Sequence, residues 1–249
     1  MGRGFLPVRR AALRLLEAAD AWLFPEQAAC LCCDCALGEE AREGLCPACT
    51  RALEAAFTRQ EKREREQREP LPDGIAYVHA AYPYEAQAKT LIVRLKYHSV
   101  RAAAVPLAHA MALLPSGEEE LIVPVPTTRR RLRERGFNQA ALLARGIGDE
   151  LGMPVLEALE REDEHAAQAS LRARERRKNL HMCMRASGDV AGRRILLVDD
   201  VYTTGSTATE AARALYESGA RSVGVFAAAR THLDEKEKNG ALFVPSRRK

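Results

Sequence analysis

One segment of this chain, residues 195–207, limits its fold and its chemistry more than any other. It opens with four apolar residues, Ile-Leu-Leu-Val, a run typical of a buried parallel strand, and leads into the adjacent carboxylates Asp199 and Asp200. The turn that follows consists of Thr203, Thr204, Gly205, Ser206 and Thr207, and precedes a helix-like run over 208–218. Ligands of open α/β sheets bind beyond the carboxyl ends of strands, where this turn lies. The segment therefore predicts a site for a phosphorylated sugar, in which the carboxylates accept hydrogen bonds from ribose hydroxyls or hold Mg²⁺, and the turn and helix N-terminus bind a phosphate.

Two other ligand classes use a similar strand, and the sequence argues against both. A Walker B strand also ends in acids, but it requires a G-x-x-x-x-G-K-[ST] loop, which this chain lacks. The glycines of residues 146–152 do not form a dinucleotide fingerprint, because the third glycine is misplaced and the segment closes a helical run. A solvated strand end before an ordinary helix cap is the remaining alternative. It requires the acids, hydroxyls and glycine to occur in this order by chance.

A second apolar strand, Leu121–Val125, also runs into a polar loop. This loop holds Thr127 and Thr128, and then five arginines within residues 129–135. Arginine side chains match phosphate oxygens in geometry, so the loop, with Arg129 at its start, is a candidate pyrophosphate site. A basic surface turn before a helix explains the same residues equally well.

The long polar segment 161–179 lies between two apolar segments, as expected of a flexible loop that closes over a ligand. It begins with Arg161, and Gln168 lies near its middle. Such a loop excludes water from a reaction in which the ligand would otherwise hydrolyse. A plain amphipathic surface helix is the alternative for its second part, residues 172–179.

Six of the seven cysteines lie between residues 30 and 49 and form three C-x₂-C pairs. Two such pairs, a dozen residues apart, supply the four thiolates of a tetrahedral zinc ribbon, and a site with only cysteine ligands is structural. In a reducing cytoplasm a metal is favoured over a redox or disulfide cluster, which is the alternative. The second pair is fixed, but overlapping first pairs leave the register open. The predicted zinc ligands are Cys30, Cys33, Cys46 and Cys49, with Cys32/Cys35 as the alternative first pair.

The composition of the chain changes after residue 69. Residues 1–69 comprise an expected N-terminal helix, the ribbon, and a charged, exposed helix over 51–69, which a proline-rich break ends. Residues 70–249 alternate between strand-like and helix-like runs, which predicts an α/β domain with a doubly wound parallel sheet. The expected strands are 75–82, 121–125, 194–198 and 222–228, and the expected helices are 85–97, 105–114, 138–151 and 208–218.

Charge and hydropathy exclude some classes of protein. The net charge of +4 is too small to indicate a nucleic-acid-binding protein by itself. No apolar run approaches the roughly 18 residues needed to span a bilayer, and Arg14, Glu17 and Asp20 interrupt any signal-peptide core. The sequence therefore predicts a cytoplasmic protein without membrane insertion.

Residues 195–207 resemble the phosphoribosyl-pyrophosphate (PRPP) motif of type I phosphoribosyltransferases, which has a hydrophobic strand, an acidic pair and then T-T-G-S-T. The order of the remaining motifs resembles the ComF family over roughly residues 20–230. One departure is Asp34-Cys35, which adds a thiol where the family more often has glycine or arginine. The motifs are the cysteine ribbon, Leu95-Lys96-Tyr97, Pro124-Val-Pro126, Arg135-Gly-Phe-Asn-Gln139, Gln168, Arg176 and Asn179.

The resemblance implies roles for the candidate residues. Asp199 and Asp200 are the expected catalytic pair, holding the ribose hydroxyls and water linked to the Mg²⁺ that accompanies PRPP. The turn 203–207 is expected to bind the 5′-phosphate, residues 127–129 the pyrophosphate, and Lys96 a further phosphate oxygen. The implied partners are a helicase-like competence ATPase and the single-stranded DNA taken up during natural transformation.

Two functions of different classes follow from these motifs. The first is a phosphoribosyltransferase acting on PRPP with inversion at the anomeric carbon, where catalysis is mainly positioning and charge neutralisation of the leaving pyrophosphate. The second is a non-catalytic adaptor with a PRPP- or nucleotide-sensing fold that docks a competence ATPase or single-stranded DNA. Base-stacking aromatic residues are scarce beside the arginines, with only Phe137 in that stretch. Protein docking is therefore favoured over direct DNA binding for the adaptor.

Overall fold

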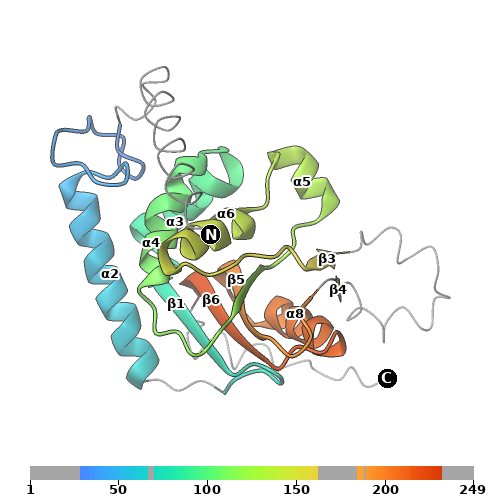
Figure 1. Cartoon of the computed structure of the whole chain (residues 1–249). Helices are drawn as coiled ribbons and strands as arrows, with labels where there is room; N and C mark the ends of the chain where they lie inside the picture. The colour runs from blue at the N-terminus through green and yellow to red at the C-terminus, as the bar shows by residue number, and fades with distance from the viewer. Residues whose placement is uncertain (1–28, 67–69, 162–183, 188, 232–249) are drawn as a thin grey trace, which may run out of the picture. The chain divides into compact units, whose positions relative to one another are not determined.

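The computed structural model describes residues 29–66, 70–161, 184–187 and 189–231 (Figure 1). The chain forms two compact units, one ending at Arg51 and the other beginning at Ala52. The division falls inside helix α2 (Pro47–Glu66), earlier than the break expected after residue 69. The domain limits 1–69 and 70–249 stay a prediction, and the expected N-terminal helix lies outside the described residues.

The larger unit is built on a four-stranded parallel sheet in the order β1-β6-β5-β2. Its strands are β1 (Tyr77–Pro83), β2 (Leu121–Pro124), β5 (Arg194–Tyr202) and β6 (Ser222–Arg230). The connecting helices are α3 (Ala86–Tyr97), α4 (Ala104–Ala112) with the short 3₁₀ turn η2 (Arg101–Ala103) before it, α6 (Gln139–Leu151) and α8 (Ser206–Glu217). These elements confirm the α/β fold with a doubly wound parallel sheet.

Helices cover both faces of the sheet, which is why its strands are apolar throughout. Side chains alternate between the faces of a strand, so Ile195 and Leu197 of β5 face the same way. They share one buried cluster with Ala211 and Leu215 of α8. Helices α3, α4 and α6 also contact the sheet, through β2, β5 and β6. Among the described helices, none combines the length and apolar character needed to cross a membrane.

One glycine of β6 makes room for a tyrosine side chain of β1. Tyr77 of β1 lies opposite Gly224 of β6. A Cβ atom at position 224 would lie 2.3 Å from Cζ of Tyr77, inside any allowed contact distance. The absence of a side chain at position 224 therefore makes room for the Tyr77 ring. The centroid of this ring lies 6.1 Å from the centroid of the Phe226 ring.

The second half of α2 covers the outer edge of β1. Oε1 of Glu64 accepts a hydrogen bond of 2.9 Å from the backbone N–H of Ala80, and Oε2 lies 3.0 Å from Nδ1 of His79. These contacts pair backbone and side-chain groups that an edge strand would otherwise expose. The helix was expected to be charged and exposed, and it does carry i,i+4 ion pairs. However, Gln60 is only 1% exposed, so one face of the helix is buried.

The smaller unit is described over residues 29–51. Two isolated antiparallel bridges, Ala29 with Ala36 and Arg42 with Leu45, fold this segment back on itself. Its few buried side chains include three cysteines, Leu31 and Leu45. A segment this short cannot build a large hydrophobic core, so cross-linking of its chain by a metal is expected to matter for its stability.

Three features differ from the sequence-based expectation. The arginine-rich loop contains a helix, α5 (Arg129–Arg135), because the hydroxyl of Thr128 accepts the Arg131 N–H at 3.3 Å and Gly136 ends the helix at φ +78°. Strand β5 continues four residues past Val198, since β6 pairs with it as far as Tyr202. Two short antiparallel strands that were not expected are β3 (Leu159–Arg161) and β4 (Met184–Ala186).

Candidate functional site

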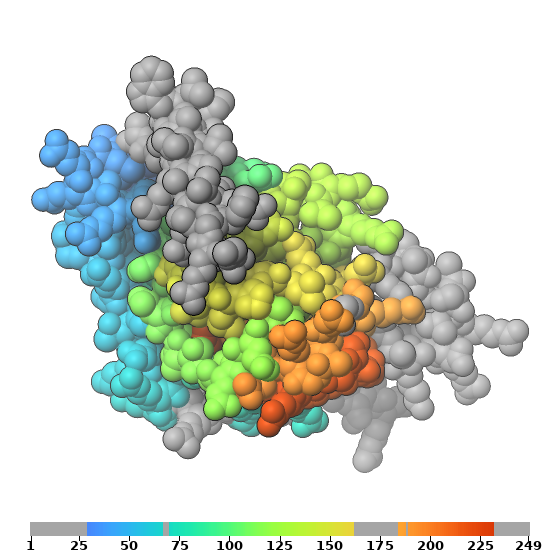
Figure 2. Space-filling view, in the orientation of Figure 1, coloured from blue at the N-terminus to red at the C-terminus, as the bar shows by residue number. Residues whose placement is uncertain are grey.

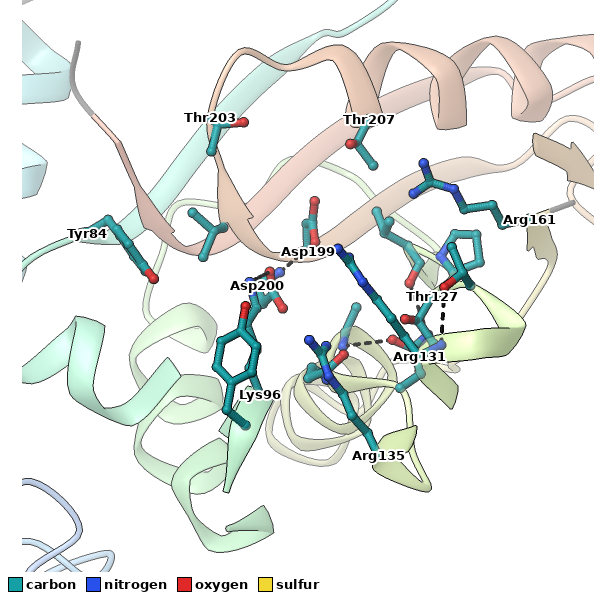
Figure 3. Close-up of a pocket in the computed structure, with 18 of the residues that line it drawn as sticks. Tyr84, Lys96, Thr127, Arg131, Arg135, Arg161, Asp199, Asp200, Thr203 and Thr207 are labelled. Atoms are coloured by element: carbon teal, nitrogen blue, oxygen red, sulfur yellow. Dashed lines mark hydrogen bonds and ion pairs between the residues drawn. The ribbon is translucent and has the colours of Figure 1, made fainter. Parts of the chain in front are cut away.

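The carboxyl ends of all four parallel strands border one cavity of about 340 Å³ (Figure 3). Tyr84 follows β1, Val125 follows β2, Thr203 follows β5 and Thr231 follows β6, and all four line the cavity. A doubly wound sheet opens a crevice at this edge, where its ligands bind. The cavity lies wholly within the larger unit.

The acidic pair lies at the centre of this edge, on the end of β5. The backbone N–H of Asp200 donates a hydrogen bond of 2.8 Å to Oδ1 of Asp199. Nζ of Lys96, in the last turn of α3, lies 2.8 Å from Oδ1 of Asp200. This ion pair is largely buried, with 19% of the lysine and 14% of the aspartate side chain exposed. Helix α3 therefore brings a cation onto the acidic pair.

Burial, and then the adjacent carboxylate of Asp200, raise the pKa of Asp199 to about 7. The ordinary value for aspartate is 3.8, so the folded state binds more protons than the unfolded state between these two values. The stability that protonated Asp199 contributes is therefore present in full at low pH and is lost as the pH rises through 7.

The substitution Asp199→Asn tests this pH dependence, because asparagine stays neutral at every pH. We expect the variant to melt close to the wild type below about pH 4 and at a higher temperature than the wild type at about pH 8, with the difference growing between these pH values. Thermal melting monitored by circular dichroism across this range measures the difference, and Asp149→Asn on the exposed surface of α6 is the control. A difference in Tm that stays constant with pH would show that Asp199 does not titrate in this range.

The hydroxyl-rich turn connects β5 to α8 and faces the cavity with two of its side chains. Thr203 and Thr207 line the cavity, whereas Thr204 caps the turn by accepting the backbone N–H of Ser206 at 3.4 Å. Gly205 has φ +79°, and a Cβ atom there would lie 2.4 Å from the hydroxyl of Tyr202. Only glycine fits this bend, which turns the N-terminus of the twelve-residue helix α8 toward the cavity side of the turn.

The opposite wall of the cavity carries hydroxyls and cations. Thr127 and Thr128 follow β2, and Arg131 and Arg135 extend from α5, whose side chains lie at the surface (Figure 2). Arg161, at the end of β3, also lines the cavity. The acids on the central strand lie between the hydroxyl turn on one side and Arg131 and Arg135 on the other, with Arg161 nearer to Thr207 (Figure 3).

The cavity brings together most of the sequence-predicted residues. Gln168 lies outside the described residues. Arg129 lines a neighbouring cavity of about 630 Å³, which shares Thr127 and Arg161 with the first. Thr204, Gly205 and Ser206 shape the turn without lining either cavity. The predicted residues on the wall of the first cavity are Lys96, Thr127, Thr128, Arg161, Asp199, Asp200, Thr203 and Thr207.

Several lining residues were not individually predicted as site residues. Arg131 and Arg135 belong to the arginine run, which was expected to be a loop. Because the run forms helix α5, these two residues, four positions apart, lie on the same face. Tyr97 is 69% exposed and packs under the guanidinium of Arg135, 5.2 Å from ring centroid to Cζ. Gln139 lines the cavity and is 3% exposed, yet its Nε2 has no hydrogen-bond partner among the described residues. Such a buried donor requires a partner, and a ligand oxygen would supply one.

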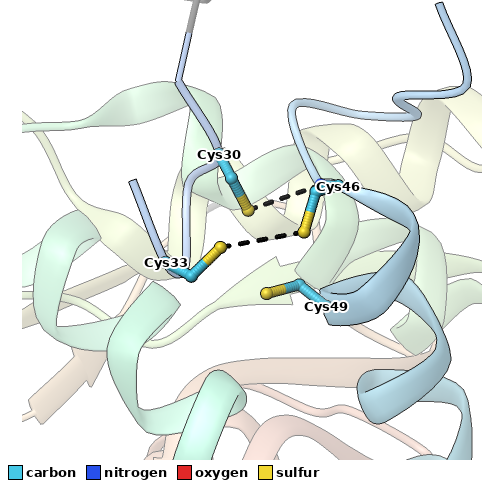
Figure 4. Close-up of side chains that lie close together, drawn as sticks. All are labelled: Cys30, Cys33, Cys46 and Cys49. Atoms are coloured by element: carbon cyan, nitrogen blue, oxygen red, sulfur yellow. Dashed lines mark hydrogen bonds between the residues drawn. The ribbon is translucent and has the colours of Figure 1, made fainter. Parts of the chain in front are cut away.

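The smaller unit holds a second candidate site. The sulfur atoms of Cys30, Cys33, Cys46 and Cys49 all lie within 4.8 Å of one another (Figure 4). Those of Cys33 and Cys46 are 3.7 Å apart, and sulfurs bound to one tetrahedral zinc at 2.3 Å are about 3.8 Å apart. The residues present thus fit a metal ion of the zinc type, and these four are the set chosen from the sequence.

The local hydrogen bonds of this cluster favour a thiolate. The backbone N–H of Cys49 hydrogen-bonds the sulfur of Cys46 and lowers the pKa of that thiol to about 6. Burial instead raises the pKa of Cys49. Cys35, a fifth cysteine, has its sulfur 3.4 Å from that of Cys33. Deprotonation of all four thiols therefore requires a cation among them, as a bound metal provides.

Comparisons with known proteins match a domain model and several named relatives. A model of the phosphoribosyl transferase domain matches residues 132–247. The DNA utilization protein YhgH of Salmonella typhimurium is 33% identical over 210 residues, which cover 81% of this chain and 90% of that protein. Competence protein ComFC of Streptococcus pneumoniae is 28% identical over 204 residues, covering 81% and 88%. YhgH of Escherichia coli K12 is 42% identical over 111 residues, which cover 44% of this chain and only 49% of that relative.

Proposed function

This chain belongs to the ComF family and carries a type I phosphoribosyltransferase domain, and on that premise we propose that its cavity binds PRPP for phosphoribosyl transfer. One observation carries the proposal. An acidic pair, a hydroxyl turn and a wall of guanidinium groups line a single cavity at the carboxyl edge of the sheet. PRPP requires the same three kinds of contact, because it combines ribose hydroxyls, a 5′-phosphate and a pyrophosphate.

Each part of PRPP has a matching part of the cavity. Asp199 and Asp200 accept hydrogen bonds from the ribose 2′- and 3′-hydroxyls. The turn 203–207 and the N-terminus of α8 hold the 5′-phosphate. Residues 127–131 and Arg161 bind the pyrophosphate through hydroxyls and guanidinium groups. The buried Nε2 of Gln139 is available as a further donor to ligand oxygen.

The two carboxylates also fit a hard divalent cation, which takes oxygen ligands, and Mg²⁺ is the proposed companion of PRPP. When bound, the ion neutralises charge on the pyrophosphate. The residues of this chain position the sugar and hold the leaving group. In the transfer, an acceptor atom bonds to C1 of the ribose with inversion as the bond from C1 to the pyrophosphate oxygen breaks, and that oxygen keeps the electron pair. The arginines stabilise the departing charge.

The four-cysteine cluster is proposed to hold a structural zinc ion. All four ligands are thiolates with no open position, so the metal stabilises the smaller unit and takes no part in chemistry. A cytoplasmic location, where thiols stay reduced, belongs to the same proposal.

A link to competence and DNA uptake follows from the relatives. Their names refer to DNA utilization and to competence, and the exposed arginines of α5 are a suitable contact for single-stranded DNA or an acidic face of a helicase-like ATPase. Fluorescence anisotropy with a labelled oligonucleotide tests direct DNA binding. If the anisotropy does not change even at low salt, the chain does not bind single-stranded DNA directly, and the partner would be a protein.

Isothermal titration of the zinc-loaded full chain with PRPP and Mg²⁺ tests the proposed function. We expect PRPP to bind at least ~10-fold more tightly than ribose 5-phosphate or pyrophosphate alone, because one molecule then engages both ends of the cavity. Equal affinity for PRPP and pyrophosphate would show that the ribose and the 5′-phosphate do not contribute to binding and that the site binds anions in general. No binding of PRPP by folded protein would contradict the proposal.

A further inference from the structure

The ion pair between Lys96 and Asp200 lies inside the proposed PRPP site. Lys96 belongs to the last turn of α3, and its ammonium is 2.8 Å from the carboxylate of Asp200 (Figure 3). Both side chains are more than four-fifths buried. A pair held this far from water is weakly screened and retains more of its attraction than a surface pair. The contact is therefore part of the site's electrostatics.

The two carboxylates of the acidic pair have different contacts. Asp200 has the Lys96 ammonium as its partner. Asp199 makes no ion pair within the described ranges and accepts the backbone N–H of its neighbour. The three arginines that line the cavity extend from α5 and β3, and in the described part of the chain none of them forms an ion pair with either carboxylate. Among the described residues, Lys96 is therefore the cation in direct contact with the acidic pair, while Arg161 acts on Asp199 without an ion pair.

An ammonium and a divalent cation cannot share one carboxylate oxygen at contact distance. Mg²⁺ binds carboxylate oxygens at roughly 2.0–2.1 Å, and two cations on the same oxygen repel each other strongly in a partly buried site. A divalent ion that binds Oδ1 of Asp200 must therefore displace Lys96, and one that binds Oδ2 still meets the repulsion of the ammonium. The displaced ammonium then lies at a cavity wall to which PRPP brings phosphate groups.

We propose that Lys96 is an exchangeable counter-cation of the acidic pair, which opposes the binding of a divalent cation by itself and assists the binding of the cation together with PRPP. The proposal rests on the proposed function and deepens it, because it explains why the site would take the metal only with its phosphorylated ligand. A lysine that merely contacted phosphate would assist PRPP without opposing the metal. The two effects thus have opposite signs only if Lys96 acts as the counter-cation.

Substitution of Lys96 by methionine separates these effects. Methionine keeps an unbranched apolar side chain of similar length but removes the charge. We expect Lys96→Met to bind Mn²⁺ alone at least ~10-fold more tightly than the wild type, and to bind PRPP at saturating Mg²⁺ at least ~10-fold more weakly. Electron paramagnetic resonance of free Mn²⁺ measures the first affinity, and calorimetry measures the second, both on the zinc-loaded full chain.

The control is Lys62→Met on α2, where the lysine is exposed, lies outside the cavity and pairs with Glu66 at 3.8 Å. It should leave both affinities unchanged. Lys96→Gln serves as a second neutral variant if methionine impairs folding. Lys96→Arg, which keeps the charge, should bind Mn²⁺ as weakly as the wild type.

Unchanged or weaker Mn²⁺ binding in the folded neutral variants overturns the proposal. If the wild type binds PRPP, an unchanged PRPP affinity in these variants also overturns it. If the wild type binds no PRPP at all, the proposed function fails, whereas the Mn²⁺ comparison still decides whether Lys96 opposes a divalent cation at Asp200.

Discussion

The double substitution Asp199→Asn with Asp200→Asn is expected to weaken PRPP binding by a factor on the order of 100 or more. Each carboxylate offers a charge-assisted hydrogen bond to the ribose, worth roughly 1.5–3 kcal/mol, and the pair also supplies the proposed oxygen ligands for Mg²⁺. Asparagine matches aspartate in size and removes only the charge. Calorimetric titration with PRPP and Mg²⁺, alongside circular dichroism to verify folding, measures the loss.

A matched control removes two negative charges elsewhere. Asp73 and Asp149 are exposed and lie outside the cavity, so Asp73→Asn with Asp149→Asn changes the net charge equally without touching the site. We expect its PRPP affinity to equal that of the wild type. If both double variants bind PRPP as the wild type does, the acidic pair plays no part in recognition.

The second large effect concerns the cysteine cluster. Cys49→Ser is expected to reduce the zinc content from stoichiometric to nearly none and to unfold residues 29–51, since a tetrahedral site that loses one of four thiolates loses most of its affinity. The short segment has few other buried side chains to hold it. Atomic emission spectroscopy measures the metal, and limited proteolysis measures the folding of this unit.

Cys32→Ser is the control for this experiment and also tests the register of the ligands. Cys32 is not among the four clustered sulfurs, so its loss should leave the zinc content unchanged. Zinc that is lost from Cys32→Ser and retained in Cys30→Ser would identify Cys32/Cys35 as the first ligand pair.

Much of the fold was predictable because its strands are continuous apolar runs. The runs at 121–125 and 195–198 are buried strands, and the polar residues after them had to lie at one edge once the sheet was parallel. The cysteine spacing likewise predicted the four clustered sulfurs. These signals are local, so the sequence contains them directly.

The contacts that could not be predicted depend on tertiary structure. Lys96 and Asp200 are distant in sequence, and only the packing of α3 beside the sheet joins them. Helix α5 is seven residues long and forms because its two ends are capped by Thr128 and Gly136. Gln139 was part of a family motif, but its burial against the cavity could not be predicted, because a glutamine at the start of a helix is usually solvated.

The pairing of β1 with β6 has a consequence for how the chain folds. Tyr77 pairs with Gly224, so β1 cannot pair with β6 until roughly 150 further residues have been synthesised. Closing so long a loop is entropically costly and slow. At ribosomal speeds of about 5–20 residues per second, β1 leaves the ribosome on the order of 10 s before β6. During that interval its inner edge is open to pairing with other chains. The yield of native protein should therefore depend on translation speed and on chaperones that shield a waiting strand.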